Sequence, residues 1–176
     1  NNLMRAYDPE YDTPIFVGKR VAVVGGGNVA MDAARSALRL GADVTIVYRR
    51  TEKELPARVE EVHHAKEEGI VFRMLTNPVQ VLGDEKGWVR GLRCIKMELS
   101  GFDSNGRKKS WDIPGSEFMM PVDLVIPAVS QYSDLPFVRK EEVEATPMGT
   151  FIVDADTQMT SMAGVFSGGD VVRGSD

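Results

Sequence analysis

The stretch VAVVGGGNVA at residues 21–30 decides the fold. Three valines and an alanine run directly into three glycines, and apolar residues with helical spacing follow from Asn28 to Leu40. This order predicts a buried strand, a tight turn and a helix. A second apolar run at Val44–Tyr48 lies about 20 residues further on, which is the spacing of a Rossmann-type β-α-β unit.

The glycines form a G-x-G-x-x-A loop between the expected strand and helix. Gly25 permits the tight turn, Gly27 lets a pyrophosphate approach the backbone, and Ala30 allows helix and strand to pack closely. Free amides and the dipole at the start of the helix attract that anion. The alternatives are a plain turn without a ligand and a site for an adenosyl group without pyrophosphate. The loop residues that we expect to contact the cofactor are Gly25, Gly26, Gly27, Asn28, Val29 and Ala30.

The end of the second strand indicates which dinucleotide the loop would take. An NAD site usually has an acidic residue there, which binds the ribose 2′-hydroxyl, whereas this chain has Arg49 and Arg50. Two guanidiniums suit a 2′-phosphate, so the pair predicts NADP(H), although a pair of solvated surface arginines is the alternative. Arg58 is a third candidate for the phosphate, but pairing with Glu61 or Glu54 explains it equally well.

The rest of the chain predicts an α/β fold with an insertion. Alternating runs with turn residues, from Val79 to about Ser116, predict an antiparallel β-meander inserted into a Rossmann-like NAD(P)-binding domain with a parallel sheet. The other expected elements are a helix at about residues 57–68, a strand opening at residue 70, a buried strand at 122–126, a charged helix from 136 to about 145, and short strands at 150–153 and 164–167.

Composition restricts the function classes. The chain has 176 residues and a net charge of -5, which argues against nucleic acid as a main partner. Its one cysteine, Cys94, is too few for a disulfide framework or for an iron–sulfur cluster held by this chain alone. The adjacent His63 and His64 face different ways on a helix, so we expect no metal site. No apolar run reaches the ~20 residues that cross a bilayer, and we expect a cytoplasmic protein without membrane contact.

Several runs together closely resemble the small (beta) subunit family of NADPH-dependent glutamate synthase. They are VAVVGGGNVAMDAAR at residues 21–35, YRRT at 48–51, ELPAR at 54–58 and AKEEG at 65–69. Related families are the NADPH-side subunit of ferredoxin-dependent transhydrogenases and the N-terminal part of dihydropyrimidine dehydrogenase. The resemblance implies a protein that binds NADPH in one domain and FAD in another, and passes hydride from NADPH to FAD. It also implies electron flow to a partner, either the large glutamate synthase subunit or another electron-accepting subunit.

The resemblance also implies a domain organisation. We expect an arm or linker at residues 1–17, an NADPH-binding domain at 18–134, and a return segment at 135–176 that belongs to a truncated FAD-binding domain of the same parent chain. Ala128 begins a run that lies near the nicotinamide in that family, in which Ser130 replaces the usual glycine. Asp170 ends the run GVFSGGD, similar to a motif whose aspartate contacts FAD.

The chain stops, by this reading, before the helix that should follow Asp170, and no first FAD-binding glycine motif precedes the NADPH domain. We therefore expect an NADPH-dependent oxidoreductase whose isolated fragment is inactive. The alternatives are a transhydrogenase-type subunit and a non-catalytic module that binds NADP(H) without transferring hydride.

Overall fold

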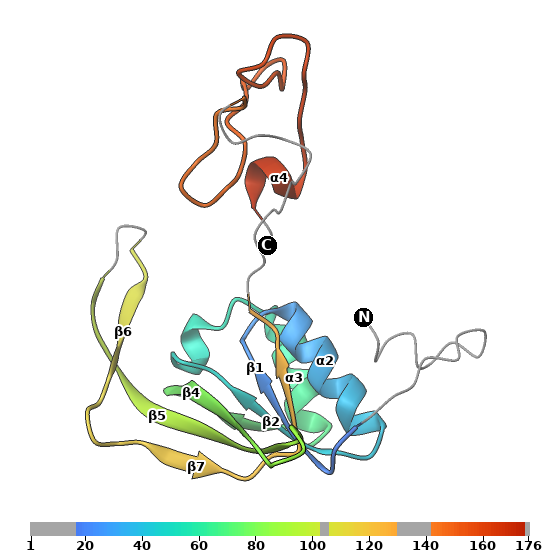
Figure 1. Cartoon of the computed structure of the whole chain (residues 1–176), viewed down its shortest axis with the longest axis vertical. Helices are drawn as coiled ribbons and strands as arrows, with labels where there is room; N and C mark the ends of the chain where they lie inside the picture. The colour runs from blue at the N-terminus through green and yellow to red at the C-terminus, as the bar shows by residue number, and fades with distance from the viewer. Residues whose placement is uncertain (1–16, 103–105, 130–141, 175–176) are drawn as a thin grey trace, which may run out of the picture. The chain divides into compact units, whose positions relative to one another are not determined.

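The computed structural model describes residues 17–102, 106–129 and 142–174. The chain divides into two compact units, residues 1–129 and 130–176. The proposed boundary at residues 134/135 and nearly all of the proposed N-terminal arm lie outside the described residues. Figure 1 follows the chain from the first unit, which holds the glycine loop, to the second.

A four-stranded parallel sheet forms the centre of the first unit. Its strands are β1 (Arg20–Val24), β2 (Asp43–Val47), β3 (Val71–Arg73) and β8 (Leu124–Pro127). They are ordered β3-β2-β1-β8 and all pair in parallel. Each of these strands was expected from an apolar run. The α/β, Rossmann-like fold predicted from the sequence is confirmed, because the strand before the glycines and the strand after the helix are neighbours in one sheet.

Two helices cover one face of this sheet, α2 (Asn28–Arg39) and α3 (Val59–Glu67). The apolar stripe of α2 is fully buried at Met31, Ala34 and Ala37, and it packs with β-strand residues such as Val23 and Ile46. Small residues on this stripe allow the helix to lie close to the sheet, so that its first turn follows directly from the end of β1.

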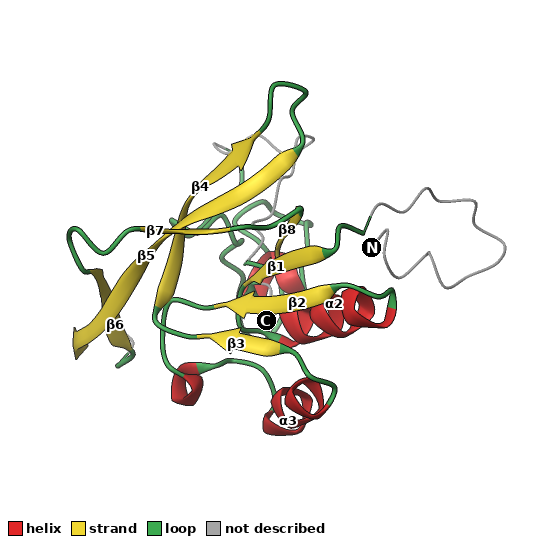
Figure 2. Ribbon diagram, turned by 90° about the horizontal axis from the view of Figure 1, so that it is seen from below, coloured by secondary structure: helices red, strands yellow, loops and turns green. Residues whose placement is uncertain are grey.

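The expected β-meander covers the opposite face of the sheet (Figure 2). It consists of β4 (Thr76–Gly83), β5 (Val89–Phe102), β6 (Lys108–Asp112) and β7 (Phe118–Met120), with β5 pairing antiparallel to the other three. Leu92 and Cys94 of β5 are completely buried and pack with Ala22 and Val47 of the parallel sheet. The first unit is therefore a three-layer domain with a core on each face of its central sheet.

The second unit contains little regular structure among the residues described in it. Isolated bridges join Ala145 to Phe151, Val153 to Thr160, and Met159 to Phe166, in place of the expected strands. The prediction of a charged helix that reaches about residue 145 is wrong at its C-terminal end, because residues 142–145 form a turn and a bridge. Residues 136–141, where the rest of this helix was predicted, lie outside the described residues.

The run after the glycines of the second unit also differs from the expectation. We expected the chain to stop before a helix, but a four-residue helix, α4 (Asp170–Arg173), begins at the aspartate itself and ends with Gly174 as its C-cap. Over all described residues, no helix is long and apolar enough to cross a membrane.

Candidate functional site

The glycine loop lies at the carboxyl end of β1, where α2 begins. The Gly25 amide donates to the carbonyl of Val47 over 3.1 Å, which ties the loop to the end of β2. Gly27 is the N-cap residue of α2, and no side chain caps the helix there. The first turn also carries no acidic residue. The positive end of the α2 dipole and its first amides are therefore available to an anion.

The three glycines are required for three different reasons. Gly25 has φ +139°, and a Cβ there would lie 2.2 Å from the carbonyl oxygen of Ala128. A Cβ on Gly26 would lie 2.7 Å from Leu55 and 2.8 Å from the Tyr48 ring. A Cβ on Gly27 would meet no atom within 4 Å. Only Gly27 faces open space, so it is the glycine whose missing side chain leaves room for a ligand rather than for the fold.

The remaining loop residues divide between the core and the surface. Ala30 is completely buried against the sheet, as its expected packing role requires, whereas the Val29 side chain is 66% exposed. Asn28 is exposed, and its Oδ1 accepts a hydrogen bond of 2.9 Å from the backbone amide of Arg58. Asn28 thus joins the loop to a segment 30 residues later in the chain.

The arginine pair follows the end of β2, at the same edge of the sheet as the loop. Arg49 is exposed and Arg50 is half-buried. Burial raises the pKa of the Tyr48 phenol, and the cations Arg50 and Arg49 act in the opposite direction. Both guanidiniums are therefore close enough to Tyr48 to act on its pKa.

A short 3-10 helix at Glu52–Glu54, which we did not expect from the sequence, shapes the segment between the arginine pair and Arg58. Thr51 caps it, with its backbone amide and its hydroxyl both donating to the Glu54 carboxylate. These bonds lower the pKa of Glu54, the Thr51 hydroxyl having the largest effect. The Tyr48 hydroxyl donates to the Glu54 carbonyl over 2.7 Å, so the segment is folded back over the loop. The pattern T-x-x-E at residues 51–54 was the available signal.

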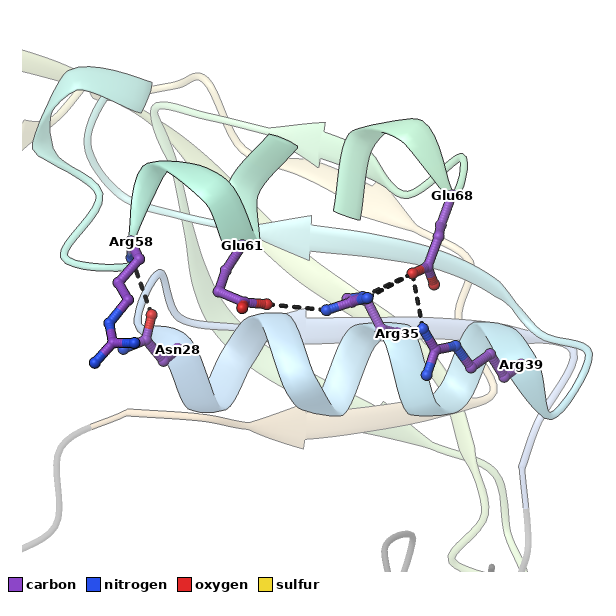
Figure 3. A network of polar contacts seen from close by, with 6 residues as sticks. All are labelled: Asn28, Arg35, Arg39, Arg58, Glu61 and Glu68. Carbon is purple, nitrogen blue, oxygen red and sulfur yellow. Dashed lines mark hydrogen bonds and ion pairs between the residues drawn. The ribbon is translucent and has the colours of Figure 1, made fainter. Parts of the chain in front are cut away.

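The two acidic partners that sequence reasoning allowed for Arg58 are both engaged elsewhere. Glu61 pairs with Arg35 at 2.9 Å, and Glu54 is bonded to Thr51. Arg58 itself is exposed and makes no ion pair with any residue in the described ranges. Figure 3 shows its side chain lying beside Asn28 at the start of α2, which leaves the guanidinium available to a ligand.

An ion-pair network holds α3 against α2 and was not expected from the sequence. Arg35 bridges Glu61 and Glu68 at 2.9 and 2.8 Å, and Arg39 also reaches Glu68 at 2.8 Å (Figure 3). Hydrogen bonds from Arg35, and then from Arg39, lower the pKa of Glu68. The Arg35 side chain is partly buried between the two helices. Arginines and acids 26 to 33 residues apart gave no local signal.

Two further predicted site residues, Ala128 and Asp170, lie far along the chain from the glycine loop and the arginines. Ala128 follows β8, and its amide donates to the Val24 carbonyl over 2.7 Å, so its own carbonyl covers Gly25. Ser130, which replaces the glycine usual in the family, lies outside the described residues. Asp170 is exposed at the first position of α4 in the second unit.

Comparisons with known proteins agree with this fold. A family model described as "Pyridine nucleotide-disulphide oxidoreductase" matches residues 3–176. The chain is 47% identical over 163 residues to the NADP(+)-dependent formate dehydrogenase subunit beta of Moorella thermoacetica, covering 92% of the chain and 23% of that protein. It is 44% identical over 161 residues to the glutamate synthase [NADPH] small chain of Azospirillum brasilense, covering 90% and 33%.

Solved structures give the same picture. Thioredoxin reductase of T. acidophilum superposes with a TM-score of 0.69 at 26% identity, over 91% of this chain and 46% of that one. The chain thus spans about a quarter to a third of the length of the two curated relatives described above.

Proposed function

The chain belongs to the pyridine nucleotide-disulphide oxidoreductase family, and from this premise we propose that residues 18–134 bind NADPH and present its hydride to an FAD. Its curated relatives include oxidoreductase subunits, among them glutamate synthase [NADPH] small chains. The observation that carries the proposal is the open face of Gly27 at the uncapped start of α2, with two arginines at the end of the neighbouring strand.

The pyrophosphate is assigned to the glycine loop. Its oxygens accept hydrogen bonds from the backbone amides of Asn28 and Val29. These amides lie in the first turn of α2, where the helix itself offers them no acceptor. The space in front of Gly27 accommodates the phosphate, because no atom of the described residues lies within 4 Å of a Cβ built there. Gly25 and Gly26 act indirectly, since they let Ala128 and Tyr48 close around the turn.

The 2′-phosphate is assigned to Arg49, Arg50 and Arg58. All three belong to the segment that follows β2 and folds back over the loop, and the end of β2 is where the adenosine ribose lies in this type of fold. Planar guanidiniums donate paired hydrogen bonds to phosphate oxygens, and the side chains at this position leave no carboxylate for a ribose 2′-hydroxyl. The arrangement therefore selects NADPH over NADH.

The redox chemistry belongs to the bound cofactors: NADPH supplies a hydride and FAD accepts it. The chain's residues bind and orient, and none is assigned as a general acid or base. We place Ala128 near the nicotinamide and Asp170 at the FAD, on the strength of the family resemblance of their runs. FAD itself is held by the remainder of the FAD domain.

The electron acceptor is a partner subunit. A glutamate synthase large subunit is the first candidate, because the sequence resembles that small-subunit family and the chain is 44% identical to one member. The 47% identity to a formate dehydrogenase beta subunit favours a second candidate, a partner of the formate dehydrogenase or transhydrogenase type. A module that binds NADP(H) without transferring hydride is the competing class.

The binding step is tested by calorimetric titration of the 176-residue chain with NADPH and with NADH. The expected result is stoichiometric binding of NADPH and weaker binding of NADH by about two orders of magnitude, from two charge-assisted contacts. The transfer step is tested in the longer parent protein by anaerobic mixing with NADPH, which should bleach the flavin absorbance. Binding without bleaching would identify a non-catalytic module, and no binding of either dinucleotide would refute the site.

A further inference from the structure

Asn28 is the first residue of α2, and its side chain connects the glycine loop to the segment that carries Arg58. The Arg58 amide donates to Asn28 Oδ1 over 2.9 Å. A backbone amide can only donate, so this bond determines which end of the Asn28 amide group faces Arg58. The Asn28 oxygen therefore accepts a hydrogen bond within the chain.

The segment at residues 54–58 is anchored at three points. The Tyr48 hydroxyl holds the Glu54 carbonyl at 2.7 Å, and the Gly26 carbonyl accepts from the Ala57 amide at 3.1 Å. Asn28 provides the third anchor, and it is the one that acts on Arg58 itself. No side-chain hydrogen bond caps α3 at its N-cap residue Arg58, and Asn28 Oδ1 accepts the backbone amide of that residue, the bond that the third helical residue makes in a capping box.

The body of α3 is held independently of Asn28. Arg35 bridges Glu61 and Glu68, and Arg39 reinforces the bond to Glu68. Removal of the Asn28 side chain should therefore loosen the backbone at Arg58, while the Ala57 amide stays bonded to the Gly26 carbonyl and the body of α3 stays in place. Figure 3 shows both sets of contacts along the length of α2.

We infer that Asn28 is a positioning residue for cofactor preference, which holds the exposed Arg58 guanidinium where it meets the adenosine 2′-phosphate. This inference rests on the proposed function. The backbone amide of Asn28 is assigned to the pyrophosphate, whereas its side chain acts on the discrimination between NADPH and NADH through the backbone of a residue 30 positions later. Loss of the Asn28 side chain should therefore lower the affinity for NADPH, which carries the 2′-phosphate, and not the affinity for NADH, which has only the pyrophosphate.

The test is a double-mutant cycle with Asn28→Ala, Arg58→Ala and the double variant, titrated with NADPH and NADH by calorimetry. Asn28→Ala should weaken NADPH about three- to tenfold, the range of one hydrogen bond, and leave NADH unchanged. In the Arg58→Ala background the same substitution should have no further effect. Arg39→Ala is the matched control, because it removes a cation from the same helix away from the loop, and both affinities should stay at the wild-type value.

Amide hydrogen exchange without cofactor supplies an independent readout. The Arg58 amide should exchange faster in Asn28→Ala than in the wild type, while the amides in the middle of α3 keep their protection. An unchanged Arg58 exchange rate, equal losses for NADH and NADPH, or additive effects of the two substitutions would each overturn the inference. If the wild-type chain prefers NADPH and any of these contradicting results is found, the inference about Asn28 fails and the proposed function stands. If the wild-type chain binds neither dinucleotide, both fail.

Discussion

The carbonyl oxygen of Ala128 occupies the position that a side chain on Gly25 would need, 2.2 Å from where its Cβ would lie. Ala128 follows the last strand of the sheet and Gly25 the first, and β1 and β8 are paired neighbours. The turn that starts the glycine loop is thus closed by a backbone segment more than 100 residues later. Gly25 is thus required by the fold, whereas Gly27 is the glycine that we assign to the ligand.

Gly25→Ala should destabilise the domain. Alanine at φ +139° is strained, and its Cβ meets backbone, which cannot move aside as a flexible side chain can. We expect a loss of about 3 kcal/mol or more in the free energy of unfolding, measured by urea denaturation. Gly27→Ala is the matched control, with φ -86° and open space, and should cost about 1 kcal/mol or less. Equal stability of the two variants would contradict the assignment.

Gly27→Val should abolish dinucleotide binding without unfolding the domain. The position is extended and nothing lies within 4 Å of its Cβ, so the branched side chain is accepted by the protein and fills only the space assigned to the pyrophosphate. Urea denaturation should give a midpoint close to that of Gly27→Ala, and calorimetry should detect neither NADPH nor NADH binding. NADPH affinity equal to that of the wild type would show that the loop is only a structural turn.

Arg49 and Arg50 together should set the preference for NADPH. Each charge-assisted bond is worth roughly 1.5–3 kcal/mol, reduced toward the lower end by solvent, so two bonds give about 3 kcal/mol or about 100-fold. The double alanine variant should lose most of this for NADPH and little for NADH, and the wild-type preference should shrink as salt rises. Because Arg50 is half-buried beside Tyr48, the single variant Arg49→Ala is the cleaner probe and should lower NADPH affinity about tenfold with unchanged thermal stability.

The outcome that contradicts this assignment is an equal loss of affinity for both dinucleotides. That result would show that the arginines bind the pyrophosphate or stabilise the folded domain. Arg49→Lys distinguishes charge from geometry, since lysine keeps the charge but cannot donate two parallel bonds, and an affinity between those of arginine and alanine is expected.

Acid should weaken the junction of β1 and β8 through Asp123. Hydrogen bonds from the side chain and amide of Arg20 lower the pKa of Asp123 from an ordinary value near 3.8 to about 2. A carboxyl whose pKa is lowered by folding stabilises the folded state above pH 3.8, and this contribution is lost as the pH falls through about 2. Asp123→Asn should therefore lower the urea midpoint at pH 6 and match the wild type near pH 2.

Arg20→Ala should reproduce this pH profile, because it removes the partner that lowers the pKa of Asp123. Both side chains are partly exposed, so the difference from the wild type should diminish at high salt. A difference between wild type and Asp123→Asn that is the same at pH 6 and pH 2 would show that the ion pair is not its source.

The sequence by itself determined the order of strand, glycine turn and helix, the inserted meander and the arginine pair after β2. These follow from local rules: an apolar run predicts a buried strand, small residues at helical spacing predict a closely packed helix, and a glycine at a turn tolerates positive φ. The arginine pair predicted NADP(H), and the family resemblance added FAD. The short helix at Glu52–Glu54, which we did not expect, also has a local signal, since it follows from a capping pattern in the sequence.

Only the tertiary structure showed which contacts the residues of the loop and of α2 make with other elements. Gly26 is required because Leu55 and Tyr48 pack against it, Arg35 is engaged by α3, and the Asn28 side chain holds the amide of Arg58. Each of these contacts joins residues from different elements, most of them 20 or more positions apart. Local spacing is silent on such pairs, because their distance is set by how closely α2, α3 and the end of β2 pack on one sheet.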